Sequence, residues 1–174
     1  MLTHWNNLMN TDCLIVKIGP HTVYPIFRVG YSTLLSVCDQ KYVNNQIKKI
    51  DHIDVMIRDP EERFVSGVNE YCKQNKLQVD EVYKAIQNGD LVDRRFAPQY
   101  IWLMHLSKYH KASITIRPFD YINKITNAHK NKSKNKMSIP VCRSFVAVDQ
   151  CLTKHYNQTM SLDEIIRRYR NVLS

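Results

Sequence analysis

The pattern of hydrophobic and polar positions predicts short strands that alternate with amphipathic helices. Short apolar or β-branched runs predict strands, whereas apolar residues at every third or fourth position predict helices. The strands are expected at residues 14–18, 23–27, 55–57 and 112–116. The helices are expected at residues 32–37, 60–73, 79–87, 98–109, 119–129 and 162–172. Such alternation predicts an α/β domain with a largely parallel central sheet flanked by helices.

Capping residues set the expected ends of several helices. Asp59 is a good N-cap before Pro60, and Glu62 follows three residues after the cap, as in a capping box. Ser161 and Glu164 repeat that spacing before the last helix. In parallel sheets, ligands bind beyond the carboxyl ends of the strands. Arg28 and Arg58 follow two predicted strands, so both are expected to project there.

Length and composition favour one globular domain over residues 1–174. Hydrophobic residues make up 44% of the chain and charged residues 24%, which is ordinary for a soluble protein. No apolar run approaches the roughly 20 residues that span a bilayer, and the first residues do not resemble a signal peptide. We therefore expect a cytoplasmic protein. The five cysteines form no CxxC pair, so free thiols and no metal site are expected.

The formal charge of +9 is concentrated in one segment. Five lysines and no acid lie between residues 124 and 136, and residues 129–137 are predicted to form a mobile basic loop. This loop would close over an anionic cofactor, hold an acidic acceptor, or simply be solvated. Nucleic-acid binding is disfavoured because no nucleic-acid-binding module accompanies the charge.

The junction between the strand at 55–57 and the next helix is a candidate anion site. The N-terminus of a helix presents free N–H groups and a positive dipole end, beside which Arg58 stands. Ser66, two helical turns further on, adds a hydroxyl donor. Alternatively, the junction is only structural, and Arg58 pairs with Glu61 or Glu62.

The same residues, Arg58-Asp59-Pro60-Glu61-Glu62-Arg63-Phe64-Val65-Ser66, resemble the sulfotransferase signature Arg-Asp-Pro-x-x-Arg-Phe-x-Ser. In that family the signature grips the 3′-phosphate of the sulfuryl donor 3′-phosphoadenosine 5′-phosphosulfate (PAPS). The resemblance implies that Arg58 and Ser66 bind this phosphate, and it implies a P-loop-like sulfotransferase fold.

An upstream segment resembles the 5′-phosphosulfate loop of the same family, Lys-x-Gly-[Ser/Thr]-[Ser/Thr]. The resemblance implies that this loop binds PAPS through Arg28, Val29, Gly30, Tyr31, Ser32, Thr33 and Leu34. Arg28 replaces the usual lysine, and Tyr31 takes the first hydroxyl position. A permanently protonated arginine stabilises developing charge but does not donate a proton, so the catalytic rate is in question. The chain has no Walker A motif.

A third segment, Asp93-Arg94-Arg95-Phe96-Ala97-Pro98-Gln99, resembles the His-[Phe/Trp]-x-Pro-Gln segment of membrane-bound carbohydrate sulfotransferases. Arg95 stands where histidine is common. The resemblance implies that Arg95 and Gln99 face the acceptor substrate. The alternative is that Phe96 anchors the core, Pro98 begins a helix and the arginines are solvated.

The resemblance implies transfer of a sulfuryl group from PAPS to a hydroxyl or amine, which releases adenosine 3′,5′-bisphosphate. The acceptor would be an anionic glycan or a small hydroxylated molecule. A hydroxyl acceptor needs a general base, and Asp93, Glu70 and His21 remain open for that role. A kinase is disfavoured because the Walker lysine and an acidic pair for Mg²⁺ are missing. A non-catalytic protein that binds nucleotides, nucleic acid or other polyanions is the main alternative.

Overall fold

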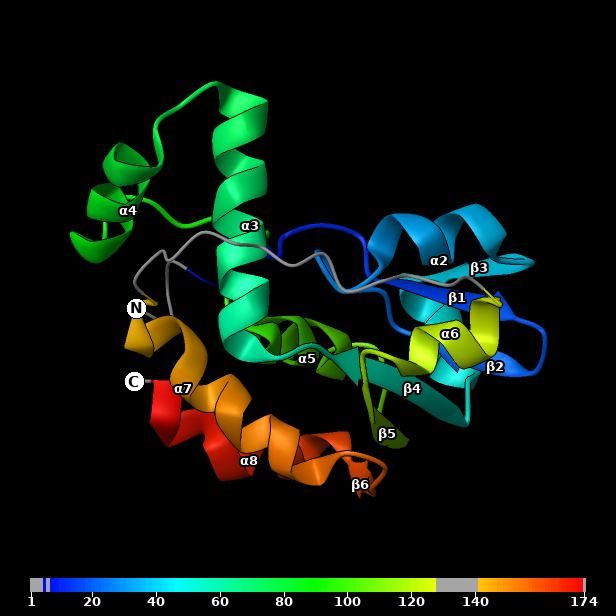
Figure 1. Ribbon diagram of the computed structural model, residues 1–174. Helices are drawn as coiled ribbons and strands as arrows, with labels where there is room; N and C mark the ends of the chain where they lie inside the picture. Colours follow the sequence, from blue (N-terminus) through cyan, green and yellow to red (C-terminus); the bar gives the residue numbers. More distant parts are fainter. Residues whose placement is uncertain (1–4, 6, 128–140, 174) are drawn as a thin grey trace.

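A computed structural model describes residues 5, 7–127 and 141–173 of the chain (Figure 1). The strands are β1 (Leu14–Ile18), β2 (His21–Val23), β3 (Gln40–Val43), β4 (His52–Ile57), β5 (Ser113–Pro118) and β6 (Thr159–Ser161). The α-helices are α2 (Tyr31–Val37), α3 (Pro60–Asn75), α4 (Val79–Gln87), α5 (Gln99–Ser107), α6 (Tyr121–Thr126), α7 (Arg143–Leu152) and α8 (Leu162–Leu173). Two short 3₁₀ helices are η1 (Asn44–Lys49) and η2 (Thr153–His155). The predicted basic loop at 129–137 lies outside the described residues.

The six strands form one mixed sheet in the order β3-β1-β2-β4-β5-β6. Only the central pairs β2–β4 and β4–β5 are parallel, whereas β1–β2, β1–β3 and β5–β6 are antiparallel. The expected largely parallel sheet is therefore wrong at both edges. A two-residue connection such as Gly19-Pro20 between β1 and β2 permits only antiparallel pairing, since a parallel partner needs a crossover of a dozen or more residues.

One face of the central strands β4 and β5 is apolar and is covered by helices. Ile53, Val55 and Ile57 of β4 are fully buried, as are Ile114 and Ile116 of β5. Helix α3 packs on α4 and α7, and α5 packs on α7 and α8 (Figure 1). Three aromatic rings meet in the core, from α3, from α7 and from the segment before α5. The ring centroids of Phe64, Phe96 and Phe145 lie 5.6–6.2 Å apart. The chain is thus an α/β domain with one core, as expected.

Helix α3 begins where the capping residues predicted. The Asp59 carboxylate accepts a 3.0 Å hydrogen bond from the backbone N–H of Glu62, and Pro60 occupies the first turn. Helix α4 has the predicted bounds, and Ser161 caps α8 through the N–H of Glu164 at 3.4 Å. No helix within the described part of the chain has the length and apolar character that would let it cross a membrane.

The strand predicted at 23–27 is wrong in its bounds. β2 ends at Val23, and the chain then turns, with the N–H of Val29 donating to the carbonyl of Ile26 at 3.0 Å. Pro25 has no N–H to donate to a ladder, and Arg28 takes a left-handed φ of 65° that no strand allows. Because the strand is short, Arg28 lies in a tight turn before α2.

Candidate functional site

Three arginines and a serine meet where β2 and β4 end. We call Arg28, Arg58, Arg63 and Ser66 the arginine cluster. Arg28 Nε donates to Ser66 Oγ at 2.9 Å, and Arg58 Nη1 donates to the carbonyl of Arg28 at 3.0 Å. These contacts join the turn after β2, the residue after β4 and helix α3. The structure therefore brings together the residues of the two predicted phosphate segments.

Arg58 is buried without full hydrogen bonding. Only 6% of the residue is exposed, and its Nε has no hydrogen-bond partner among the described residues. The carboxylate of Glu62 lies 3.9 Å away, and the guanidinium stacks 5.2 Å from the ring centroid of Phe119. Burial lowers the pKa of Arg58, Glu62 raises it, and the charge of Arg28 lowers it further. A buried cation with an unused donor favours an anion, which would complete its hydrogen bonding.

A second layer of residues holds Arg58 in place. The Gln99 carboxamide accepts from the backbone N–H of Arg58 and donates to its carbonyl, both at 2.9 Å. Gln99 is fully buried, and its own backbone N–H donates to Asp149 at 2.6 Å. These contacts favour a positioning role for Gln99 over contact with an acceptor. Burial raises the pKa of Asp149 to about 6.

Arg63 resembles Arg58 in burial but not in hydrogen bonding. Its guanidinium donates to the carbonyls of Phe27, Arg94 and Ala97, the first two at 3.0 and 3.1 Å. Burial lowers its pKa to about 10, while Asp149 opposes that shift. Each of its three nitrogens donates to a backbone carbonyl, so Arg63 ties three segments of backbone together.

The loop before α2 needs its glycine. Gly30 caps α2 with φ of 72°, and a Cβ there would collide with the side chain of Ile122. The Tyr31 ring lies edge-on to Phe27, with centroids 4.6 Å apart. Ser32 is exposed and Thr33 half-buried, whereas the side chains of Val29 and Leu34 are buried. The buried side chains of Val29 and Leu34 are therefore not placed to meet a ligand, and contact from these two residues would come from their backbone.

A polar stripe runs along α3 from the arginine cluster to the third predicted segment. Glu70 lies 3.9 Å from Arg28 Nη1 and accepts from Gln74 at 2.7 Å. Gln74 in turn accepts from Arg95, which forms a 2.9 Å ion pair with Asp93. The predicted residues Glu70, Asp93 and Arg95 therefore belong to one connected surface.

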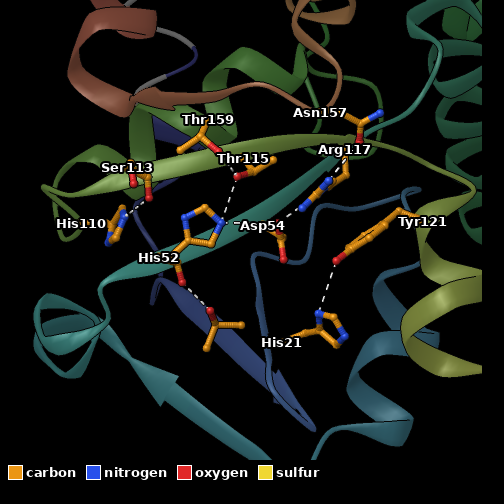
Figure 2. Close-up of polar contacts among 11 residues, drawn as sticks. His21, His52, Asp54, His110, Ser113, Thr115, Arg117, Tyr121, Asn157 and Thr159 are labelled. Atoms are coloured by element: carbon orange, nitrogen blue, oxygen red, sulfur yellow. Dashed lines mark hydrogen bonds and ion pairs between the residues drawn. The ribbon is translucent and has the colours of Figure 1, made fainter.

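His21 lies away from this surface. It begins β2, whereas Arg28 and Arg58 follow the ends of β2 and β4, and its Nδ1 lies 3.3 Å from the hydroxyl of Tyr121 (Figure 2). Of the three candidate bases, His21 alone makes no contact with the arginine cluster or with the stripe on α3.

Figure 2 shows a second polar region, in the middle of the sheet, which we call the Asp54 network. Arg117 Nε donates to the buried Asp54 carboxylate at 3.1 Å, and His52 Nε2 lies 3.6 Å from the same oxygen. Thr115 Oγ1 lies 3.0 Å from His52 Nε2, and the Arg117 guanidinium stacks on Tyr121 at 4.7 Å. Burial and the Asp54 charge raise the pKa of Tyr121. Every charge here has a partner.

Two features of the site are not evident from the motifs alone. Arg63 occupies a fixed position of the quoted signature but carries no assigned ligand role, and Asp149 lies about 90 positions after Arg58 with no local motif.

Across the described residues, no three His, Cys, Asp or Glu side chains are grouped to hold a metal ion. Comparison with family models, with curated proteins and with solved structures finds no match to this chain.

Proposed function

We propose that this protein is a PAPS-dependent sulfotransferase that uses the arginine cluster to bind the phosphate groups of its donor. The observation that supports this most is Arg58, which is buried to 94% (6% exposed) at a helix N-terminus and keeps an unpaired Nε. The proposal includes the finer fold class, a P-loop-like sulfotransferase fold. It rests on the three sequence resemblances together with the geometry of the cluster.

In this proposal each end of the cluster binds a different phosphate. Arg58 and Ser66 would hold the 3′-phosphate, and Arg28 with the backbone of Gly30–Thr33 would hold the 5′-phosphosulfate. The 2.9 Å bond between Arg28 and Ser66 supports this division, since it brings the two sets of donors within reach of one ligand. A bound 3′-phosphate would accept charge-assisted hydrogen bonds from Arg58 and from the Ser66 hydroxyl.

PAPS supplies the sulfuryl group, and adenosine 3′,5′-bisphosphate is the leaving product. The role of the protein is to position the donor and to stabilise negative charge on the leaving phosphate. Arg28 is suited to the second task because it is half-buried and always protonated. A proton for the leaving group would have to come from elsewhere.

Glu70 is the best placed of the three candidate bases. It is half-buried and lies beside Arg28, so an acceptor hydroxyl at the end of the phosphosulfate loop would be within its reach. Both carboxylate oxygens of Asp93 already bind Arg95 Nη1 at 2.9 Å, which leaves that carboxylate less available. Arg95 would then bind an anionic group of the acceptor, such as a carboxylate or sulfate of a glycan.

The test is calorimetric binding of adenosine 3′,5′-bisphosphate and of ADP to the natural chain, to Arg58→Met and to Arg168→Met. Arg168 is exposed on α8, so its variant changes the net charge equally and leaves the cluster intact. We expect micromolar binding of the 3′,5′-bisphosphate, weaker binding of ADP, and a loss of about 100-fold in Arg58→Met only. Equal binding of both nucleotides that Arg58→Met leaves unchanged would contradict the proposal.

The second candidate is a nucleotide-binding protein without transferase activity. Two observations favour it, namely that Arg28 replaces the usual lysine and that Glu70 is held as the counter-ion of Arg28. Incubation with PAPS and a panel of glycan and phenolic acceptors separates the two candidates. A sulfotransferase releases adenosine 3′,5′-bisphosphate in an acceptor-dependent reaction, and a binding protein only retains PAPS.

A further inference from the structure

A basic groove lies at the end of the sheet away from the arginine cluster. It has a volume of about 630 Å³ and is formed by the neighbouring antiparallel strands β1 and β3, by β2, and by helix η1 with the residue after it. Its lining residues are Lys17, Thr22, Gln40, Lys41, Tyr42, Asn45, Gln46, Lys49 and Ile50. We call it the lysine groove. Volumes of about 300–1,000 Å³ are typical of small-molecule sites.

The groove is separate from the proposed donor site. The hydroxyl of Thr22 donates to the carbonyl of His52, which begins β4, whereas Arg58 follows the last residue of that strand. Six residues of strand place the two ends about 20 Å apart. A ligand in the lysine groove therefore does not occupy the arginine cluster.

Three lysines reach the groove from three elements, β1, β3 and η1. Lys41 and Lys49 are exposed and Lys17 is half-buried. Among the ion pairs within residues 5, 7–127 and 141–173, none involves these three ammonium groups. No acidic residue of the described chain lines the groove, and Asp39 beside it accepts from the backbone N–H of Gly19 at 2.7 Å. The groove thus holds three uncompensated positive charges.

The neutral side chains of the groove also favour a ligand rich in acceptors. The carbonyl oxygen of the Gln46 side chain accepts from the N–H of Val43 at 2.9 Å, and that of Gln40 accepts from the Tyr42 hydroxyl at 3.2 Å. Both glutamines thereby use an oxygen within the protein and keep their NH₂ donors for other partners. Ammonium and amide donors together suit sulfate, carboxylate and hydroxyl oxygens.

We propose that the lysine groove binds an oligosaccharide that carries two or more sulfate or carboxylate groups. The lysines would pair with the anionic groups, the glutamine amides would donate to sulfate or hydroxyl oxygens, and a sugar ring would pack on Tyr42 and Ile50. A single-stranded nucleic acid fits less well because Tyr42 is the one aromatic ring that lines the groove in the described chain, and base stacking uses several such platforms. This inference does not depend on the proposed transferase activity.

The test measures binding of a sulfated heparin-type hexasaccharide to the natural chain and to the triple variant Lys17→Gln, Lys41→Gln and Lys49→Gln. The control triple variant is Lys73→Gln, Lys84→Gln and Lys154→Gln, three exposed lysines on other elements that remove equal charge. We expect the groove variant to weaken binding at least about tenfold and the control variant less than about threefold, with affinity falling as salt rises.

Several outcomes would overturn the proposal. Equal weakening by both triple variants would assign binding to net charge alone. An oligonucleotide of matched charge that binds more tightly, or maltohexaose that binds as well, would exclude the proposed ligand class, as would absence of hexasaccharide binding. If the triple variant fails to fold, Lys41→Gln with Lys49→Gln replaces it, because both side chains are exposed, and it should weaken binding about fivefold.

Discussion

Two polar regions on strand β4 differ in how their charges are balanced. In the Asp54 network, in the middle of the strand, one buried carboxylate contacts Arg117 and lies near His52 (Figure 2). In the arginine cluster, at the end of the strand, three arginines crowd together, and the carboxylates of Glu62 and Glu70 approach only to 3.9 Å. In the first region the charged groups pair with one another, whereas the second retains a buried donor on Arg58, its Nε, that has no hydrogen-bond partner in the described part of the chain.

The difference separates structural from ligand-binding polar groups. Buried polar groups in folded proteins are almost always hydrogen-bonded, so a network that closes on itself is sufficient to stabilise the sheet. A buried cation that stays unpaired lowers stability, and such an arrangement is consistent with a ligand that supplies the missing acceptor. Arg63 and Arg58 show the same contrast within a single motif of nine residues.

The largest expected effect is on stability and comes from Arg63. Replacing Arg63 by Met leaves the carbonyls of Phe27, Arg94 and Ala97 buried without their donor, so we expect a loss of about 3–5 kcal/mol in the free energy of unfolding. Urea unfolding measures it. Arg58→Met is the matched control and should lose less than half as much, because it breaks only one hydrogen bond. Equal losses would remove the distinction between the two arginines.

The next effect is a pH dependence that arises from Asp149. Its pKa is raised by burial to about 6 in the folded protein, so between pH 4 and 6 the folded state retains a proton that the unfolded state has lost. The free energy of unfolding should therefore fall as pH rises through this window, by on the order of 2–3 kcal/mol from this residue. Unfolding in urea at pH 4.5 and 6.5 measures the change.

Asp149→Asn provides the control for that pH dependence. The amide has no titrating proton, and its single carbonyl oxygen accepts from only one of the backbone N–H groups of Gln99 and Tyr100, because these bind different oxygens of the carboxylate. That lost hydrogen bond lowers the stability of the variant equally at every pH. The free energy of unfolding of the natural chain minus that of the variant should be larger at pH 4.5 than at pH 6.5, because only the natural chain gains stability when Asp149 is protonated. A difference that is constant with pH would mean that the pKa of Asp149 is the same in both states.

A smaller effect is expected in the Asp54 network. Asp54→Asn keeps the shape of the side chain but removes the charge that faces Arg117, so the free energy of unfolding should fall by about 1–3 kcal/mol. Binding of adenosine 3′,5′-bisphosphate should stay within about twofold of the natural chain, because the network is closed on itself. Substantial loss of nucleotide binding in a folded variant would show that the two regions act together.

The smallest effect on stability is expected from Ser66→Ala. Arg28 Nε loses its partner but is half-exposed to water, so the loss should be about 1 kcal/mol or less. Binding of adenosine 3′,5′-bisphosphate should nevertheless weaken about tenfold, with ADP unchanged. Ser107→Ala is the control, since Ser107 is also a helical serine but bonds only its own helix. Nucleotide affinity equal to that of the control would exclude a role for Ser66.

Much of the fold follows from local signals, and the exceptions have physical causes. Helix α4 has a regular apolar stripe and a clear stop at Asn88-Gly89, so its predicted bounds hold. β3 was not predicted because Gln40 and Lys41 are exposed on an edge strand, which needs no buried alternation. Helix α7 was also missed, although Phe145, Val148 and Leu152 form an apolar stripe at helical spacing.

The candidate site was predictable only where its residues are close in sequence. Arg58 and Ser66 lie on one junction, and the strand order brings Arg28 beside them. Gln99 lies 41 positions after Arg58, and Asp149 lies 50 positions after Gln99. Gln99 binds the backbone of Arg58 and Asp149 binds the backbone of Gln99, and such contacts have no sequence pattern. Arg58 and Arg63 belong to the same motif, yet Arg63 has a hydrogen-bond partner for each nitrogen and Arg58 Nε has none among the residues that the structure describes. This difference is likewise set by the tertiary structure.

The most direct test of the central claim removes the 3′-phosphate and the Arg58 guanidinium separately and together. The affinities of adenosine 3′,5′-bisphosphate and of 5′-AMP are measured by calorimetry for the natural chain and for Arg58→Met. If Arg58 binds the 3′-phosphate, removing that phosphate should weaken binding about 100-fold in the natural chain and less than about threefold in the variant. Equal losses in both proteins would show that Arg58 does not contact the 3′-phosphate, and would contradict the proposed donor site.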